Sequence, residues 1–315
     1  MQTRRRKSAP ADAPADAARP PSAPADAQPS PADAARPPSW LLLQALSLSA
    51  VPAAQLALAP AGTPLLPWPT HAAWPTFVLL GLVPLAFFAL CAGAWAAVDA
   101  AVARGWAPRL AACKLQADWQ PRAADYLVAL RSAAVSWLCV GLPFAWLLCS
   151  AVGPRLGLPL AGDAPWSAWQ LAAHLPGFLV CVEVGFYASH RLLHSRALFK
   201  AVHAQHHEFS APFALAAVHA HPIEHLISNV APISLGPLLL RSHPATAAAW
   251  ACIAIFSTCG AHCGYYVPGL TRSPFHDHHH AVYTENFGVL GAVVGLDRWL
   301  GTSTRFRAKW AARAA

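Results

Sequence analysis

Long runs without a charged side chain constrain the fold of this chain more than any other feature. Residues 37–98 contain no Asp, Glu, Lys or Arg, which is enough for two membrane-spanning helices of about 20 residues each with a turn between them. Further uncharged runs cover 132–154, 164–182, 225–240 and 242–271. Only 11% of all residues are charged, against roughly a quarter in ordinary soluble domains. The sequence therefore predicts an all-α integral membrane protein.

We expect four or more transmembrane helices. Two lie in 37–98, one in 132–154 and one in 164–182, and a hairpin follows in 225–271. The first arm of this hairpin, 225–240, is short for a full crossing and favours a re-entrant or partly immersed segment. Whether 225–271 spans fully is left open.

Basic residues next to the predicted spans indicate the orientation, because positively charged loops stay on the cytoplasmic side. The N-terminus is basic at 4–7 and the connection 99–131 carries five basic residues, whereas Arg155 and Arg241 stand alone in the opposite loops. Following this count, the segment 187–224 and the tail after Thr271 both face the cytoplasm. The histidine-rich segments would form a helical cap there.

The first 39 residues have a different composition. The nine-residue stretch Pro-Ala-Asp-Ala-Ala-Arg-Pro-Pro-Ser occurs at 14–22 and again at 31–39, and such a segment has little apolar surface to bury. We expect a disordered tail rather than a signal peptide, because about thirty polar or proline-rich positions separate the basic residues from the first apolar run.

Histidines are concentrated in the second half of the chain, where fourteen of the sixteen fall between His190 and His280. Their spacings of three and four residues place side chains on one face of a helix, and the pattern His-x-x-His-His occurs twice. Eight or more imidazoles exceed the three or four protein ligands of one zinc ion. The pattern predicts a site for two metal ions, and two irons would be suited to activating dioxygen. The grouped histidines are His190, His194, His203, His206, His207, His276, His279 and His280.

Residues 175–305 carry a series of motifs in a fixed order. They are Tyr187-Ala-Ser-His190-Arg-Leu-Leu-His194, His203-Ala-Gln-His206-His207, Ala220-His221-Pro222-Ile223-Glu224, His262-Cys-Gly-Tyr265, His276-Asp277-His278-His279-His280, Asn286-Phe-Gly288 and Asp297-Arg-Trp-Leu-Gly301-Thr302. In order and number they resemble the fatty acid hydroxylase and sterol desaturase superfamily. Upstream of this region only the pattern of spans is shared.

The resemblance implies a membrane-bound, non-haem diiron oxidoreductase that hydroxylates or desaturates an unactivated C–H of a lipid with O2. Sterol-like, fatty acyl and related lipids all fit this class. Ala261 stands where the sterol-oxidising branch often has an acidic residue, which weakens an assignment to sterol.

The same resemblance implies the site residues. The eight grouped histidines are the expected iron ligands, and His221 and His262 are further ligands or their close neighbours. Carboxylates commonly orient ligand imidazoles by accepting the remaining N–H, a role that we expect for Glu224, Asp277 and Asp297. The roles of His219, His225 and His278 are left open.

The resemblance also leads to a division of the chain. We expect a disordered tail at 1–39, N-terminal transmembrane helices at 40–174, a diiron domain at 175–305 and a basic C-terminal tail at 306–315.

Electrons must come from outside the chain. The sequence has no Gly-x-Gly-x-x-Gly after a strand-like run for NAD, and no haem or iron–sulfur segment. We expect a separate ferredoxin-like or cytochrome-like donor, docking on the basic cytoplasmic face. The other expected partner is a membrane lipid, with no role for nucleic acid. The individual lipid and the oligomeric state are not predicted.

Two other functions fit parts of the sequence. A histidine-rich metal transporter would need ionisable residues near the membrane midplane, but the predicted spans are mostly Ala, Leu, Val, Phe and Trp. A membrane zinc peptidase could use His221, Glu224 and His225, which fit the pattern His-x-x-Glu-His. The peptidase interpretation leaves the other histidine groups without a purpose.

Overall fold

The computed structural model describes residues 73–163 and 165–314, and every regular element within these ranges is a helix. One isolated antiparallel bridge joins Lys114 to Tyr265. The all-α prediction is therefore confirmed for the described part of the chain. The predicted tail at 1–39 and the first predicted span lie outside the described residues.

Within 73–163 and 165–314, four helical segments are long and apolar enough to cross a membrane. Each corresponds to one of the uncharged runs, and their bounds follow. The first, Ala73–Ala103, comprises α2 (Ala73–Phe77), η3 (Val78–Leu82) and α3 (Val83–Ala103); the second, Ala123–Arg155, comprises α5 (Ala123–Val135), η4 (Ser136–Gly141), α6 (Leu142–Leu147), η5 (Leu148–Val152) and α7 (Gly153–Arg155); the others are α8 (Ala168–Leu193) and α12 (Pro244–His262).

Proline explains the irregular turns in these helices. Proline has no N–H, and its ring clashes with the carbonyl four residues earlier, so the helix widens locally. In the described residues, each of the π-helical turns η3, η4, η5 and η8 (His225–Val230) ends two residues before a proline. The prolines concerned are Pro84, Pro143, Pro154 and Pro232.

The first arm of the predicted hairpin is a continuous helical segment that is not among the four candidate spans. It comprises α10 (Pro222–Glu224), η8 and α11 (Ala231–Leu239). α11 packs closely on α8, since a Cβ atom at Gly236 would lie 2.7 Å from Cδ1 of Phe178. Partial immersion of this arm stays a prediction.

The long helices differ in what their two faces contact. Between α3, α5, α12 and η7 (Ala214–Val218), a buried core contains Phe88, Ala133, Val218 and Cys259. The opposite faces expose large apolar side chains, including Leu90, Leu130, Leu138, Val180, Val184, Ile253 and Phe256. Apolar side chains in such numbers on the outer faces fit contact with lipid. Together with the four apolar helices, this describes an integral membrane protein.

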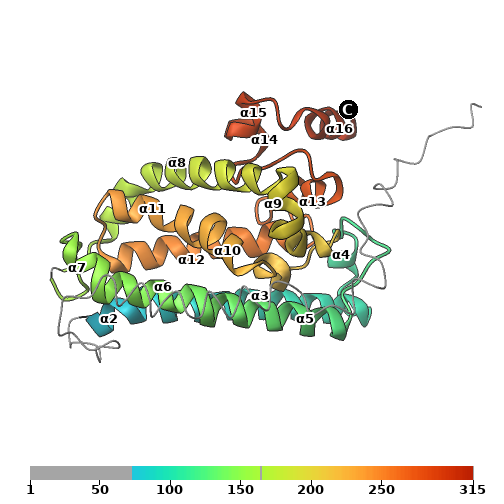
Figure 1. Cartoon of the computed structure of the whole chain (residues 1–315). Helices are drawn as coiled ribbons and strands as arrows, with labels where there is room; N and C mark the ends of the chain where they lie inside the picture. Colours follow the sequence, from blue (N-terminus) through green and yellow to red (C-terminus); the bar gives the residue numbers. More distant parts are fainter. Residues whose placement is uncertain (1–72, 164, 315) are drawn as a thin grey trace, which may run out of the picture. The chain divides into compact units, whose positions relative to one another are not determined.

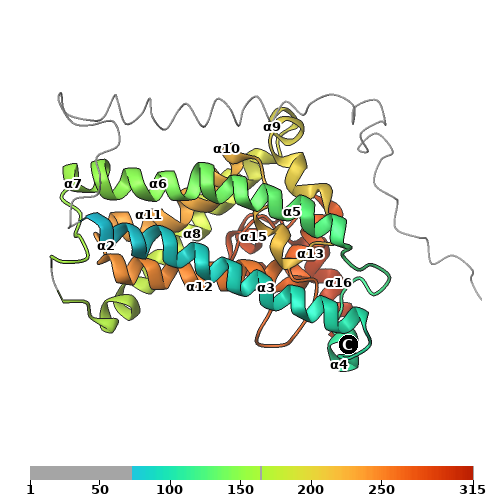
Figure 2. The same ribbon diagram turned by 90° about the horizontal axis from the view of Figure 1, so that it is seen from below.

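The long helices lie side by side, with α11 and α12 between α8 and the layer of α3, α5 and α6 (Figure 1). α7 and the start of α2 lie at one end of this bundle, whereas α4, α9 and α13 lie at the other (Figures 1 and 2). The shorter helices are α4 (Pro108–Ala111), α9 (Arg196–Ala201), η6 (His203–Glu208), α13 (Ser273–Val282), α14 (Gly291–Val294), α15 (Leu296–Trp299) and α16 (Thr304–Ala314). The histidine-rich segments thus meet at one end, and its cytoplasmic orientation stays a prediction.

Candidate metal centre

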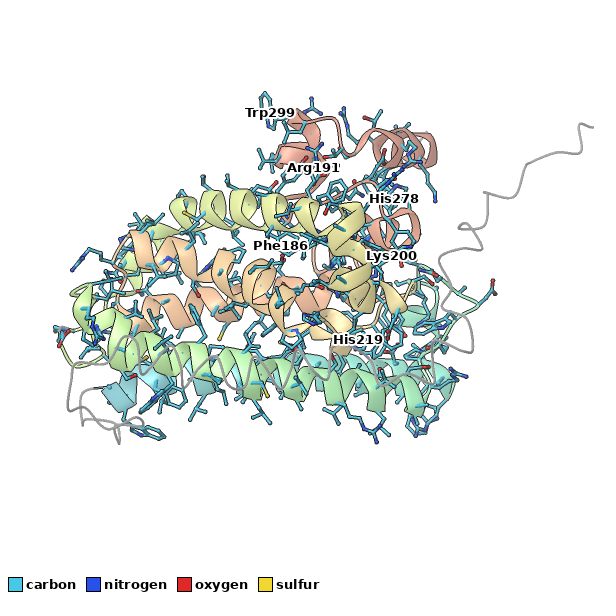
Figure 3. The ribbon with its side chains drawn as sticks, in the orientation of Figure 1. Phe186, Arg191, Lys200, His219, His278 and Trp299 are labelled. Atoms are coloured by element: carbon cyan, nitrogen blue, oxygen red, sulfur yellow. The ribbon has the colours of Figure 1, made fainter. Side chains whose placement is uncertain are left out.

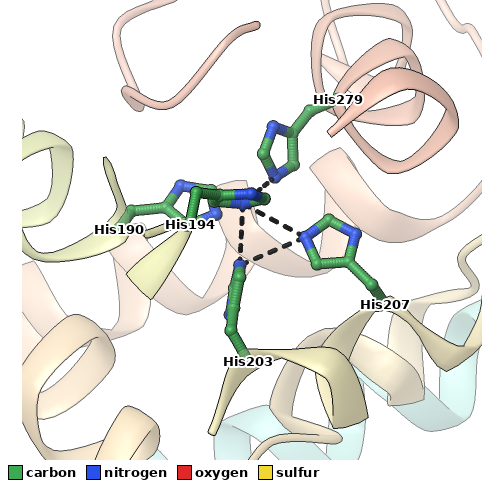
Figure 4. Close-up of side chains that lie close together, drawn as sticks. All are labelled: His190, His194, His203, His207 and His279. Atoms are coloured by element: carbon green, nitrogen blue, oxygen red, sulfur yellow. Dashed lines mark hydrogen bonds between the residues drawn. The ribbon is translucent and has the colours of Figure 1, made fainter. Parts of the chain in front are cut away.

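Five imidazoles converge in what we call the first histidine group (Figure 4). His190 and His194 come from the end of α8, His203 and His207 from η6, and His279 from α13. The Nε2 atom of His194 lies 2.9 Å from that of His203, 3.3 Å from that of His207 and 3.1 Å from that of His279. All five side chains offer a nitrogen within 4.8 Å of the others.

A second histidine group lies beside the first and contains His206, His262, His276 and His280. Its Nε2 atoms are separated by 3.4 Å between His206 and His262, 2.9 Å between His262 and His276, and 3.1 Å between His276 and His280. The ring centroids of His280 and His207, one from each group, are 4.7 Å apart. The two groups are therefore adjacent.

Each His-x-x-His-His motif supplies both groups. On α13, His276 and His280 are four residues apart and share one face, whereas His279 is turned by about 100° from His280. His276 and His280 therefore belong to the second histidine group, whereas His279 belongs to the first. The motif on η6 divides in the opposite sense, because its outer histidines enter the first group and His206 the second.

Backbone carbonyls hold the outward-facing ring nitrogen of several of these histidines. Nδ1 of His190 lies 2.8 Å from the carbonyl of Phe287, and Nδ1 of His279 lies 2.7 Å from the carbonyl of Glu285. In the second group, the carbonyls of Thr258 and Phe209 hold Nδ1 of His262 and His280 at 2.9 and 3.0 Å. A carbonyl oxygen only accepts, so these Nδ1 atoms carry the proton and each Nε2 presents a lone pair to its group.

This arrangement fits a bound metal ion. Two lone pairs facing each other cannot form a hydrogen bond, and the buried Nε2 of His190 has no partner. A metal–nitrogen bond of about 2.0–2.1 Å places two ligand nitrogens about 3.0 Å apart at a right angle and about 3.4 Å apart at a tetrahedral angle. The observed separations of 2.9–3.4 Å match these values. Imidazole ligands suit iron, zinc and copper.

Burial keeps these imidazoles in the neutral form that binds metal. Burial, followed by neighbouring imidazoles, lowers the pKa of His194 to about 2, and burial lowers the pKa of His203 to about 3. Burial is also the main cause that lowers the pKa values of His207, His279 and His280 well below the ordinary value for histidine. All five rings are uncharged at neutral pH.

The other predicted site residues lie around these groups. Oε1 of Glu224 lies 2.9 Å from Nδ1 of His203, which is within ion-pair distance but without hydrogen-bond geometry. His221 lies in neither group; its Nδ1 accepts the backbone N–H of Ile223 and so caps α10. Asp277 has a different partner from the one expected, because it accepts a hydrogen bond from the side chain of Gln116 at 2.8 Å.

Asp297 acts on the backbone rather than directly on an imidazole. It accepts the N–H groups of Phe287 and Gly288 at 2.9 and 2.6 Å. Since the carbonyl of Phe287 holds His190, Asp297 positions this histidine through the intervening loop.

Glu183 on α8 holds the same loop, and sequence reasoning missed it. This buried carboxylate accepts the N–H groups of Val289, Leu290 and Leu296 at 2.9, 2.8 and 2.6 Å. A Cβ atom at Gly288 would lie 2.6 Å from Oε1 of Glu183, so this position needs glycine. The available signal was an acidic residue at the edge of an apolar run, since buried charge in a membrane helix is seldom without a role.

A second buried network was also missed. Asp99, at the end of the first span, accepts the phenol O–H groups of Tyr126 and Tyr265 at 2.6 Å each, and Nζ of Lys114 lies 3.7 Å away. The tyrosine of the His-x-Gly-Tyr motif thus joins the segment after α12 to α3.

The three histidines of open role lie outside both groups. Nε2 of His219 lies 2.9 Å from Oε2 of Glu208, and Nε2 of His278 lies 3.3 Å from Oε2 of Glu285. His225 is buried and its Nε2 has no partner among the described residues. His221, Glu224 and His225 form no common group, so the geometry does not favour a zinc peptidase.

A cavity of about 1010 Å³ reaches both histidine groups. Apolar side chains of α8 and α12 form one part of its wall, including Leu179, Val182, Phe186, Trp250 and Ile253. Histidines of both groups form another part, namely His190, His203, His206, His262 and His276. The site therefore combines candidate metal ligands with space for a large apolar molecule.

Comparison with known proteins agrees with this geometry. Residues 175–302 match the family model described as fatty acid hydroxylase. The chain is 41% identical over 149 residues to fatty acid hydroxylase domain-containing protein 2 of Homo sapiens, covering 47% of this chain and 44% of that protein. It is 40% identical over 134 residues to fatty acid hydroxylase ahd1 of Mycosarcoma maydis, covering 42% and 34%. To methylsterol monooxygenase 2-2 of Arabidopsis thaliana it is 34% identical over 166 residues, covering 50% and 60%.

The chain spans about half the length of the curated relatives it matches, and no solved structure matches it. The fold and the site define an all-helical integral membrane protein with a histidine-rich centre that could hold metal. The chain belongs to the fatty acid hydroxylase and sterol desaturase superfamily.

Proposed function

We propose that this protein is a membrane-bound diiron oxygenase that hydroxylates or desaturates an unactivated C–H of a lipid. The observation that carries the proposal is the pair of buried histidine groups opening into one apolar cavity. Relatives named as hydroxylases and as a methylsterol monooxygenase support the same reaction class.

Nine histidines would hold the two iron ions, five in the first group and four in the second. His221, expected as a tenth ligand, has no place in either group. Bound iron supplies the activation of dioxygen, which protein side chains do not perform by themselves. Backbone carbonyls would keep the Nε2 lone pairs of His190, His262, His279 and His280 directed into their groups. Glu224 lies beside Nδ1 of His203.

The remaining side chains would bind and orient the lipid. Leu179, Val182 and Ile253 line the cavity beside the histidines. Transfer of an apolar chain from water into this cavity is therefore favourable, and the bound chain excludes water from the site. Hydroxylation takes up one O2, two electrons and two protons and yields an alcohol and one water. Desaturation removes two hydrogens from the lipid and yields two waters from the same reactants.

The partners and the orientation belong to the same proposal. A separate ferredoxin-like or cytochrome-like donor would supply the electrons, with the histidine groups on the cytoplasmic face. We also propose the boundaries 1–39, 40–174, 175–305 and 306–315 for the tail, the N-terminal helices, the diiron domain and the basic end.

Metal analysis and oxygen uptake test the proposal. Purified protein should contain close to two irons per chain and consume O2 when reduced in the presence of lipid. His206→Ala and His279→Ala should lose iron and turnover, because each removes a ligand from one group. His278→Ala is the matched control on the same helix, since its ring faces Glu285. Full iron content and activity in either ligand variant would remove that residue from the site.

The same measurements distinguish the rival function. A metal transporter would release its ions readily and would show no oxygen uptake upon reduction. Bound iron that resists dialysis, together with oxygen uptake, would exclude transport as the main activity.

A further inference from the structure

The cavity that reaches the histidines has a rim of a single charge sign. Arg272, Arg298 and Arg307 line it and are exposed. Among the described residues, the only carboxylate in its wall is that of Glu224, which is buried against His203. The cavity is thus apolar along one part, histidine-rich along another and cationic at its exposed edge.

The guanidinium groups of this rim have spare hydrogen-bonding capacity. Arg272 donates from Nη1 to the carbonyl of Val289 at 3.3 Å. Within the described residues, the side chains of Arg298 and Arg307 have no hydrogen-bond or ion-pair partner, although other basic residues nearby do, such as Arg305 with Glu285. A guanidinium presents several N–H groups in a planar fork that fits carboxylate and phosphate oxygens.

An exposed apolar surface borders this rim. On α14 and α15, Val293 is 76% exposed and Trp299 is 78% exposed, and Val294 and Leu300 beside them are exposed as well. Val293 also lines the cavity. These helices lie along α8, and Trp299 points away from the bundle (Figures 1 and 3).

This combination describes a position at the membrane interface. Tryptophan is enriched where hydrocarbon meets headgroups, and arginine beside it would lie at headgroup level. A lipid moving from the bilayer into the cavity would keep its polar end at the arginines while its chain passes toward the histidines. A neutral lipid would leave the guanidinium charges without a counter-charge, whereas an anionic head would supply one.

We propose that the cavity selects amphiphiles with one anionic headgroup, which Arg298, Arg307 and Arg272 hold at its rim. The inference rests on the proposed function for the reaction, but it concerns recognition alone. The headgroup chemistry is that of a carboxylate or a phosphate monoester.

Binding without turnover tests this proposal. The full chain is purified in a neutral detergent without reductant, and dissociation constants are measured for palmitate, hexadecyl phosphate and hexadecanol, which share one chain length. Palmitate or hexadecyl phosphate should bind at least about tenfold more tightly than hexadecanol, a difference of about 1.4 kcal/mol. Added salt should weaken binding of the anions and leave hexadecanol unchanged. The tighter of the two anions identifies the headgroup.

A pair of double variants assigns the effect to the rim. Arg298→Gln with Arg307→Gln should remove the preference for the anions and leave hexadecanol binding unchanged. Arg109→Gln with Arg196→Gln removes the same charge from exposed positions outside the cavity wall, and this control should keep the preference. Equal binding of palmitate, hexadecyl phosphate and hexadecanol by the unmodified protein would overturn the proposal. Loss of the preference for the anions in both double variants would also overturn it.

These results are separable from the proposed reaction. A protein that holds iron and oxidises neutral lipids without preferring anions refutes only the headgroup assignment. A protein that prefers anions through the rim but retains no iron refutes only the oxygenase assignment.

Discussion

Glu183 should control the order of the loop that holds His190. In Glu183→Ala, the N–H groups of Val289, Leu290 and Leu296 lose their acceptor. An unsatisfied buried donor costs about 1–3 kcal/mol, and these three residues are only partly buried, so we take the lower value for each. The total of about 3 kcal/mol raises the open population of the loop by about a hundredfold.

Hydrogen–deuterium exchange of the amides in 287–296 measures this opening, and iron content reports its effect on His190. We expect faster exchange there, with unchanged protection in α12, and partial loss of iron. Glu183→Gln keeps one acceptor oxygen, so its exchange rate in 287–296 should lie between those of the unmodified protein and Glu183→Ala. Glu208→Ala serves as the control, because the Glu208 side chain is 57% exposed and its carboxylate pairs with His219 rather than with the loop 287–296. Unchanged exchange in 287–296 and full iron in Glu183→Ala would refute the role assigned to this carboxylate.

Three further predictions concern acid, packing and the buried network. Burial lowers the pKa values of His194 and His203 to about 2 and about 3. Below pH 6.5 these histidines therefore take up protons in the unfolded chain but not in the folded chain. For each of them, the free energy of unfolding should fall by about 1.4 kcal/mol per pH unit until the pH reaches the pKa of the folded state. Circular dichroism and iron content during acidification check this, and metal retention unchanged at pH 4 would contradict it. Gly236→Ala should lower the Tm, since its Cβ would lie 2.7 Å from Phe178, with a cost of about 1–3 kcal/mol; Gly93→Ala, which meets nothing within 4 Å, should not lower it. Tyr265→Phe removes a 2.6 Å hydrogen bond to Asp99 and should cost about 1–3 kcal/mol in thermal unfolding, whereas an equal effect of Tyr266→Phe would argue against a specific role.

Periodic and compositional features of the sequence predicted the helices well. The run 132–154 lies within the helical segment Ala123–Arg155, and 168–182 of the next run lies in α8. Both helical segments continue beyond the uncharged runs, to Ala123 and to Leu193. These extensions carry charged residues such as Arg131 and Glu183, which a search for uncharged residues excludes. Within the run 242–271, helix α12 ends at His262, before the end of the run, because Gly264 adopts a positive φ of 77°.

The site was predictable in its residues but not in its geometry. Spacing on one helix face brought His276 and His280 together, yet no local pattern could assign His279 to the other group, because that depends on where η6 and α8 lie. Glu183 was missed for a related reason. Its partners are backbone N–H groups more than a hundred residues away, and backbone groups leave no mark in the sequence.

The contribution of η6 and α13 to both histidine groups has a consequence for how the proposed irons would bind. Each of these short helices carries ligands for both groups, so an ion in one group would immobilise side chains required by the other and reduce the entropy loss of the next binding event. Loading should then be positively cooperative. Under iron limitation, molecules with both ions would coexist with molecules that hold none, and molecules with a single ion would be scarce.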